Sequence, residues 1–175
     1  MEKIKINHSN HPFYASFKEL YTTSFPIFEQ RTEPQQEYAF SCEKYHLIGY
    51  CDEENFVGFI AYWEFDNYLY IEHLAINTSL RGKGYGSQLL NDFISSTSKI
   101  VLLEIDPVID EISEARLRFY KKCGFYSNPY LHSHPAYRAD YPPHRLIVLT
   151  TQRPITATEY EQFSHDLNSV VMKFL

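Results

Sequence analysis

A short glycine-rich stretch in the middle of the chain has the residue types that bind an anion. It reads LRGKGYGSQLL, and three of the six glycines of the chain alternate there with a lysine and a tyrosine, at Gly82, Lys83, Gly84, Tyr85 and Gly86. Glycine permits positive φ and lets a ligand approach the main chain, while a helix N-terminus offers unpaired N–H groups. The stretch therefore predicts a phosphate-binding turn at the start of a helix.

The glycine spacing excludes two common nucleotide-binding patterns. A P-loop needs GxxxxGK[ST] and a dinucleotide-binding fold needs GxGxxG, whereas this stretch reads GxGxG with its lysine between the first two glycines. The main-chain amides from Arg81 to Ser87 are instead expected to wrap a phosphate group, with added positive charge from Arg81 and Lys83.

A second candidate for chemistry is Glu72, in the strand-like segment YLYIEHLAI. A period of two predicts Tyr68, Tyr70 and Glu72 on one face of the strand and His73 on the other, as a hydrogen-bonded core residue. Burial among aromatic side chains is expected to raise the pKa of the Glu72 carboxyl toward neutrality. A carboxyl group of that kind suits a general base.

Two other patterns are rejected as reactive centres. Cys123 is expected on the buried side of a helix at its C-terminus, where the helix dipole opposes a thiolate. His132 and His134 have the spacing of a metal-binding pair, but no cysteine or acidic residue has matching spacing, so no metal is predicted. These histidines are expected to face solvent or to line a substrate site.

Two irregular segments carry the side chains expected to bind a substrate. Residues 25–31 read FPIFEQR, and residues 130–144 are rich in proline and histidine. Loops of this kind often carry the specificity of an enzyme. The substrate-binding candidates are Phe28, Glu29 and Arg31 from the first segment, together with Tyr70.

Composition is typical of a water-soluble globular protein. The 175 residues are 44% hydrophobic and are expected to form a single domain, residues 1–175. A formal net charge of −6 argues against a nucleic-acid partner. Three cysteines without a CxxC pair are typical of a reduced compartment, and no apolar run reaches the ~20 residues of a membrane span. The first residues lack the apolar centre of a signal peptide, so a cytoplasmic location is expected.

Hydrophobic periodicity predicts an α+β fold with a mixed sheet. Helical spacing runs over residues 11–25 and 35–45, and the next three strand-like runs read as an antiparallel meander joined by turn residues. The expected strands are residues 2–7, 45–52, 56–65, 68–77, 99–106, 125–130 and 145–151. Three further helices are expected: one after the glycine-rich stretch, one at residues 110–124, and one after the capping-box pair Thr156 and Glu159.

The helix expected at residues 110–124 has two sides that bear on function. A buried stripe of Ile112, Ala115, Phe119 and Cys123 is expected, and Gly124 is expected to end the helix as its C-cap. The side next to that stripe carries positions i, i+3 and i+7, which share one face of a helix. Those positions are Ser113, Arg116 and Tyr120.

Two motifs about forty residues apart complete the pattern. The first, R/Q-x-x-G-x-G/A, is met by Arg81, Gly84 and Gly86, and it follows a strand and precedes an amphipathic helix. The second, an aromatic–Tyr pair followed by Lys and Gly-Phe, is met by Phe119, Tyr120, Lys122, Gly124 and Phe125. In this order, over about residues 45–125, the chain resembles the GNAT superfamily of N-acetyltransferases.

The resemblance implies both a fold and a cofactor. The fold is a three-layer α/β arrangement, in which helices flank a mixed, mostly antiparallel sheet that is splayed between its fourth and fifth strands. Acetyl-CoA is the implied acetyl donor, with its pantetheine arm between the splayed strands and against the amides of Leu74 and Ile76. The implied cofactor-binding residues are Leu74, Ala75, Ile76, Arg81, Gly82, Lys83, Gly84, Tyr85, Gly86, Ser87, Ser113, Arg116 and Tyr120.

The resemblance also implies direct attack of a primary amine on the thioester of acetyl-CoA. Glu72 is the expected base for the amine, with Glu104 on the neighbouring strand as the alternative. Tyr120 is the expected acid, because a phenol is protonated at neutral pH and can hydrogen-bond the departing sulfur.

The acceptor itself is not defined by these motifs. A small-molecule or amino-acid-like amine is expected, and acetylation of a protein or peptide is one alternative. A coenzyme A-binding sensor without turnover is the other. The protein is expected to act as a monomer or homodimer.

Overall fold

The protein is described by a computed structural model that covers residues 1–80 and 82–173. One mixed sheet has the strand order β1-β2-β3-β4-β5-β8-β6, and β7 pairs with β8. The strands are β1 (Glu2–Lys5), β2 (Tyr45–Asp52), β3 (Asn55–Glu64), β4 (Tyr68–Ile76), β5 (Ile100–Ile105), β6 (Phe125–Ser127), β7 (His132–His134) and β8 (His144–Thr151). The helices are α1 (Tyr14–Ser24), α2 (Glu33–Ser41), α3 (Tyr85–Ser95), α4 (Glu111–Lys122) and α5 (Ala157–Asp166), with short helical turns η1 (Ile27–Glu29), η2 (Thr78–Leu80) and η3 (Leu167–Val171).

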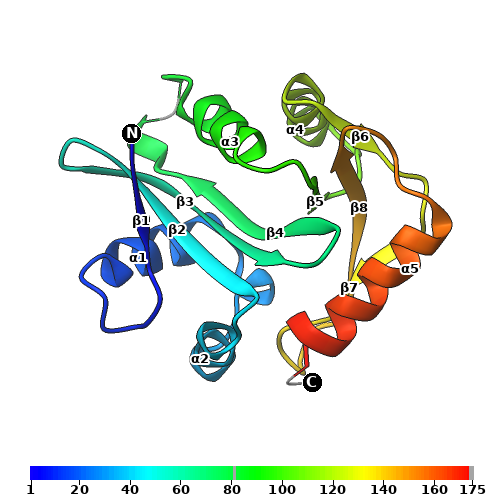
Figure 1. The fold of residues 1–175 in the computed structure, drawn as a ribbon, viewed down its shortest axis with the longest axis horizontal. Helices are drawn as coiled ribbons and strands as arrows, with labels where there is room; N and C mark the ends of the chain where they lie inside the picture. The colour runs from blue at the N-terminus through cyan, green and yellow to red at the C-terminus, as the bar shows by residue number, and fades with distance from the viewer. Residues whose placement is uncertain (81, 174–175) are drawn as a thin grey trace.

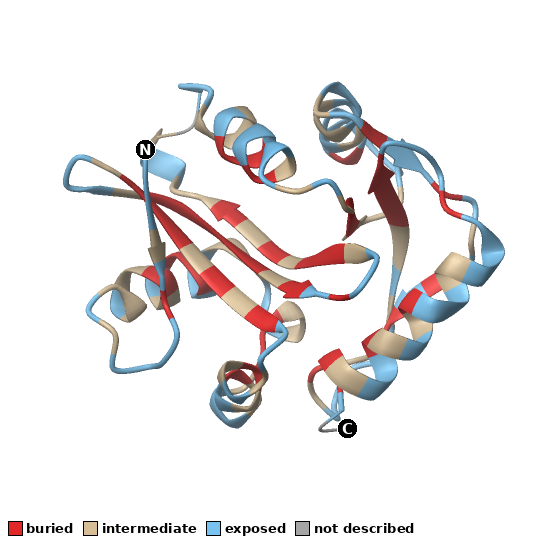
Figure 2. Cartoon of the chain, viewed as in Figure 1, coloured by how far each residue is buried: buried red, intermediate tan, exposed pale blue. Residues whose placement is uncertain are grey.

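Helices cover both faces of the sheet and give the protein three layers (Figure 1). On one face, α1, α2 and α5 bury residues such as Phe17, Ala39 and Phe163 against the strands. On the other face, α3 and α4 pack through residues such as Leu90 and Phe119. The buried positions follow the central strands and the inward sides of the helices (Figure 2), so the sheet has an apolar core on each side.

The predicted fold class and meander are confirmed. β2 occupies the predicted residues, and β3 and β4 differ from the prediction by one residue at their ends. The second helix begins at Glu33 rather than at residue 35, because Thr32 and Gln35 form a capping box one turn earlier. β7 lies in the segment that was expected to be irregular, where its residues pair with β8.

The predicted splay of the sheet is confirmed between β4 and β5. These two strands are parallel, and their pairing runs only from Tyr68–Ile100 to Tyr70–Leu102. β4 continues to Ile76 in its pairing with β3, while β5 continues to Ile105 in its pairing with β8. The two strands therefore part just before Glu72.

A β-bulge at this point overturns the predicted face of His73. The register of β3 with β4 passes from Tyr62–Ile71 to Ala61–His73, so one residue of β4 has no direct partner. An extra residue shifts the alternation of side chains. His73 consequently lies on the same side as Glu72, with 3.8 Å between His73 Nδ1 and Glu72 Oε2. The expectation that the two side chains point apart is wrong.

The predicted buried stripe of α4 is also wrong in its first half. Ile112 is 73% exposed and Ala115 is exposed, whereas Ser113 is buried. The inward positions run from Ser113 through Leu117 to Tyr120, a spacing of four and three residues. The predicted end of the helix is confirmed, since Gly124 follows the C-cap with φ +98.

Candidate active site

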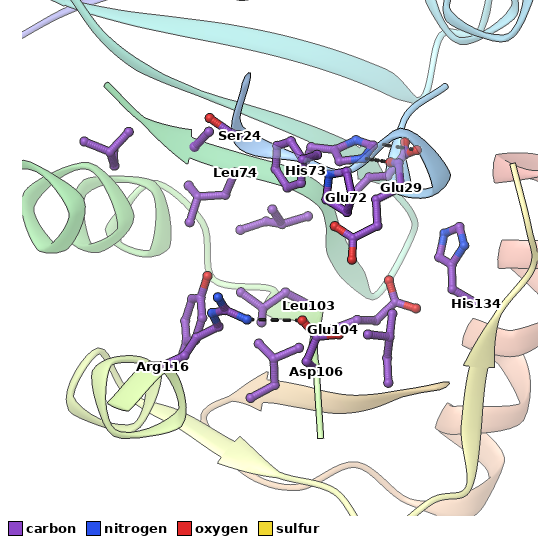
Figure 3. Close-up of a pocket in the computed structure, with 18 of the residues that line it drawn as sticks. Ser24, Glu29, Glu72, His73, Leu74, Leu103, Glu104, Asp106, Arg116 and His134 are labelled. Atoms are coloured by element: carbon purple, nitrogen blue, oxygen red, sulfur yellow. Dashed lines mark hydrogen bonds and ion pairs between the residues drawn. The ribbon is translucent and has the colours of Figure 1, made fainter. Parts of the chain in front are cut away.

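A cavity of about 890 Å³ opens where β4 and β5 part. Backbone and side chains from both strands line it, together with the start of α3 and one side of α4. The loop before η1 and the segment from β7 to β8 close the opposite side (Figure 3). Among the described residues, this cavity therefore joins the glycine-rich turn, both candidate carboxylates and both predicted substrate segments.

The glycine-rich turn forms the end of the cavity at α3. Gly84 is the N-cap of α3 in the left-handed region, with φ 76, and Gly82 has φ 84, so both positions favour glycine. The first N–H groups of the helix have no partner within the helix, and they belong to residues that line this end. Gly82, Gly84, Tyr85, Gly86 and Ser87 line the cavity, Lys83 is exposed beside it, and Arg81 lies outside the described residues.

Tyr85 also ties the turn to the sheet. Its hydroxyl donates a hydrogen bond to Asp52 Oδ2 at 2.5 Å, at the hairpin between β2 and β3. The residue predicted to bind the cofactor therefore also fixes the position of the first turn of α3.

The edge of β4 supplies hydrogen-bond donors along the cavity. Asn77 N donates to Val57 O at 2.7 Å, which makes that pair a hydrogen-bonded one. Bonded and non-bonded pairs alternate in an antiparallel ladder, so the N–H groups of Leu74 and Ile76 point away from β3. They point to the edge from which β5 has separated, and both residues line the cavity with Ala75.

Helix α4 contributes Tyr120 and Arg116 to the cavity. Burial raises the pKa of Tyr120 to about 12, so its phenol stays protonated at neutral pH. Arg116 forms an ion pair with Asp106, with 3.2 Å between Nη1 and Oδ2. Ser113 does not fit its predicted role, because its hydroxyl donates to Asp110 and accepts from the Ile109 and Asp110 amides in a capping box.

Glu72 has the aromatic surround that was predicted but not the predicted pKa. Arg31 Nε and Nη2 donate to its two oxygens at 2.8 and 3.0 Å, Trp63 Nε1 donates at 2.8 Å, and the Tyr137 hydroxyl donates at 2.6 Å. Burial favours the neutral carboxyl, but the Arg31 and His73 charges and these hydrogen bonds outweigh it and lower the Glu72 pKa to about 2. The expectation of a raised pKa is wrong, and Glu72 is a fixed anion.

Glu104 is held in a second buried network on β5. It accepts hydrogen bonds from the Tyr70 hydroxyl and from His132 Nε2, the latter at 2.6 Å. His132 Nδ1 lies 2.8 Å from the Tyr160 hydroxyl of α5. Burial opposes the ionised form, but the charge of His134 and the two hydrogen bonds outweigh it and lower the pKa of Glu104.

Two of the four predicted substrate residues line the cavity and two do not. Phe28 and Glu29 are among its lining residues. Arg31 is 2% exposed and binds Glu72, and Tyr70 is fully buried and binds Glu104. The prediction that these two residues contact a substrate is wrong, because each donates a hydrogen bond to a carboxylate from behind the cavity wall.

A third polar cluster lies at the side of the cavity. Glu29 Oε1 and Asp106 Oδ1 lie 3.4 and 2.9 Å from Nδ1 and Nε2 of His144. One ligand atom from each residue falls within 4.8 Å of the others, a spacing that a metal ion tolerates. Both nitrogens of His144 already face a carboxylate, however, so a ring that bridges two acids accounts for the cluster. Burial, and then the charge of Asp106, raises the pKa of Glu29.

The sequence patterns did not mark Tyr137, and they left His134 between a solvent-facing and a substrate-lining position. His134 is only 5% exposed and lines the cavity, which fits the substrate-lining expectation rather than the solvent-facing one. The alternation of two histidines around Ser133 was the available signal, since it places both on the inward side of β7. Tyr137 lies in a loop, and no periodicity marks it.

The cysteines take no part in the site. Cys42, Cys51 and Cys123 are free thiols. Burial raises the pKa of Cys123, which agrees with its rejection as a nucleophile. Within the described residues, no helix has the length and apolar character to cross a membrane.

A splayed mixed sheet with a glycine-rich helix entrance beside the splay defines the class of the N-acetyltransferase folds. The family model described as "Acetyltransferase (GNAT) family" matches residues 11–125. The chain therefore belongs to the acetyltransferase (GNAT) family.

Solved structures and a curated relative agree with this assignment. A GNAT-family protein of Bacteroides thetaiotaomicron superposes with a TM-score of 0.90 at 26% identity, over 98% of each chain. The "Putative acetyltransferase YjbC" of Bacillus subtilis is 31% identical over 58% of this chain and 52% of its own length, so the match spans about half of that relative. A Bacillus subtilis acetyltransferase in complex with CoA shares the fold, with a TM-score of 0.59 at 15% identity over 86% of this chain and 97% of that one.

Loss of Arg31 is expected to destabilise the protein by about 3–5 kcal/mol, because Arg31→Met leaves the Glu72 carboxylate buried without its cation. Chemical denaturation at pH 7 measures the change in the free energy of unfolding. The control is Arg153→Met, which removes an exposed ion pair with Glu159 and should cost less than about 1 kcal/mol.

A double variant and the pH dependence test the same cause. Arg31→Met with Glu72→Gln should recover much of the loss, because no uncompensated charge remains. The folded-state pKa of Glu72 lies below its ordinary value of 4.5, so the pair stabilises the protein above that pH and the benefit is lost toward pH 2. Equal losses for Arg31→Met and Arg153→Met would contradict this account.

Proposed function

We propose that the protein transfers the acetyl group of acetyl-CoA to a primary amine by direct attack. The observation that carries the proposal is the line of N–H donors that runs from the start of α3 along Leu74 and Ile76 into a cavity with acidic walls. Family membership supports it, and so does the complex of the related Bacillus subtilis acetyltransferase with CoA.

The residues of the cavity divide between the two substrates. The pyrophosphate of coenzyme A would accept hydrogen bonds from the first amides of α3, beyond Gly84, where the helix dipole favours an anion. The pantetheine arm is a chain of amides, so it can accept from Leu74 and Ile76 as an added strand would. Tyr120 would then stand at the thioester, where its protonated phenol can donate to the departing sulfur.

The acceptor side of the cavity favours a cationic small molecule. Glu29, Glu104 and Asp106 line it, and Arg116 is its only arginine or lysine among the described lining residues. Phe28 adds an aromatic surface. An amine without a carboxylate group is attracted to this negatively charged lining more strongly than an amino acid is.

A panel of amines tests the activity itself. Incubation with acetyl-CoA should release free thiol in proportion to acetylated amine, detected by a thiol reagent and by mass spectrometry. Alkyl diamines should give a higher kcat/KM than amino acids of equal length, because the acceptor side is acidic. Binding of CoA without thiol release from any amine would indicate a sensor, and release with peptides alone would indicate a protein acetyltransferase.

The affinity for coenzyme A should depend on the conformation of Gly84. Gly84→Ala places a Cβ at φ 76, which disfavours the left-handed turn by about 1–2 kcal/mol and disturbs the amides that follow. We expect Kd for CoA to rise at least about tenfold by calorimetry. Gly124→Ala has a similar strain at φ +98 but lies after α4, outside the cavity lining, and should leave Kd unchanged. Equal effects of the two variants would contradict the phosphate-binding role.

Tyr120→Phe should lower kcat by roughly 10²-fold or more with little change in Kd for acetyl-CoA, since only the proton donor is lost. The loss should shrink for an acetyl thioester of a more acidic thiol, whose thiolate leaves without a proton. Tyr126→Phe makes the same chemical change at an exposed position on β6 and serves as the control. A uniform loss with every thioester would show that Tyr120 does not act on the leaving group.

A further inference from the structure

We propose that His134 Nε2 accepts the proton that the acceptor amine loses when it attacks the thioester, an inference that rests on the proposed acetyl transfer. The residue comes from β7, outside the glycine-rich turn and the β4 segment in which the sequence motifs place the chemistry.

The orientation of the His134 ring is set by its own chain neighbour. His134 Nδ1 lies 2.7 Å from the carbonyl oxygen of Pro135. A carbonyl oxygen can only accept, so Nδ1 carries a proton in this contact. In the neutral ring the lone pair therefore lies on Nε2. Because His134 lines the cavity, a basic nitrogen is available to an acceptor there (Figure 3).

The Tyr137 hydroxyl, which lies near His134 Nε2, donates its proton to another group. Nε2 of His134 lies 3.4 Å from the Tyr137 hydroxyl, at the limit of a hydrogen bond. That hydroxyl has one proton, and its contact with Glu72 Oε2 is much shorter, at 2.6 Å. The proton of Tyr137 therefore goes to Glu72, and the lone pair of His134 stays available.

Neither carboxylate of the site is as well suited to accept a proton. Each oxygen of Glu72 accepts two hydrogen bonds, one of them from Arg31, which uses the four lone-pair positions of the group. Glu104 accepts from Tyr70 and His132 and has a lowered pKa. Both groups remain anions, which makes them weak bases toward an alkyl amine.

A protonated His134 interacts with the carboxylates of the site. Its charge lowers the pKa of Glu104. Protonated Nε2 can donate to the Tyr137 oxygen, whose proton is bonded to Glu72. The opposing groups include His73 on β4 and Arg31 beyond Glu72, and Arg31 is already neutralised by its ion pair. His144, which pairs with His134 between β7 and β8, is held between the carboxylates of Glu29 and Asp106. Two buried anions thus face one cation that forms during the reaction.

The proton balance of the step is complete. The lone pair of the neutral amine attacks the acetyl carbon, and the proton of the amine nitrogen passes to His134 Nε2. The carbon–sulfur bond breaks, and the thiolate takes a proton from the Tyr120 hydroxyl. His134 then returns its proton to solvent, and Tyr120 regains one, so the products are an amide and free coenzyme A.

His134→Asn isolates the role of Nε2. The asparagine amide N–H can replace Nδ1–H in the bond to Pro135, but it provides no basic atom. We expect kcat to fall by roughly 10²–10⁴-fold at neutral pH, with loss of the acidic limb of the pH–rate profile and unchanged Kd for acetyl-CoA. Added imidazole should restore part of the rate. His165→Asn, an exposed change on α5, is the matched control.

Three outcomes are distinguishable. A His134→Asn variant with near-normal kcat and the same acidic limb would overturn the proposal. So would a Glu104→Gln variant that loses the limb while His134→Asn keeps it, since the base would then be Glu104. If the unaltered protein releases no thiol with any amine although it binds CoA, the proposed acetyl transfer itself fails, independently of His134.

Discussion

The parting of β4 from β5 is the constraint on which the rest of the structure depends. Their parallel pairing ends at Tyr70 and Leu102, so the following part of β4 has lost a partner on one edge. Buried main-chain donors are costly unless they are paired. The N–H groups of Leu74 and Ile76 are therefore compatible with the fold only because a cavity gives them access to an external acceptor. A ligand that is itself a chain of amides can accept hydrogen bonds from these N–H groups along its length.

Buried charges hold the strands around the opening. Glu72 follows the last paired residue of β4 closely, and Glu104 has the corresponding place on β5. Each carboxylate needs hydrogen-bond donors, and the chain supplies them from distant segments. Glu72 accepts from Arg31 before α2 and from Tyr137 after β7, and Glu104 accepts from His132 on β7. Arg31 also lies 5.6 Å from the ring centres of Trp63 and Tyr137. Buried ion pairs add little net stability, so we infer that these networks fix geometry.

Local patterns predicted the elements but not the contacts between them. The glycine-rich turn, the meander and the end of α4 before Gly124 depend on neighbours in sequence, and the structure has them. The face of His73 depends on a bulge, which exists only in the pairing of β3 with β4. The pKa of Glu72 depends on Arg31, forty-one positions away, so burial alone predicted the wrong direction. Arg31 was predicted to contact a substrate from its residue type and its position in a loop. Neither feature shows that its partner is a buried carboxylate.

The two kinds of ionisable group at the splay have different consequences. A carboxylate that accepts two hydrogen bonds from an arginine and two from further donors is a constant source of negative potential, and for that reason it is a weak base. A histidine with one proton fixed by a main-chain carbonyl keeps its second nitrogen basic. His134 connects the two kinds of group, because its charge lowers the pKa of Glu104 and its Nε2 lies 3.4 Å from the Tyr137 hydroxyl that is bonded to Glu72. In the proposed transfer, the carboxylates therefore act through their electric field, and the proton goes to His134.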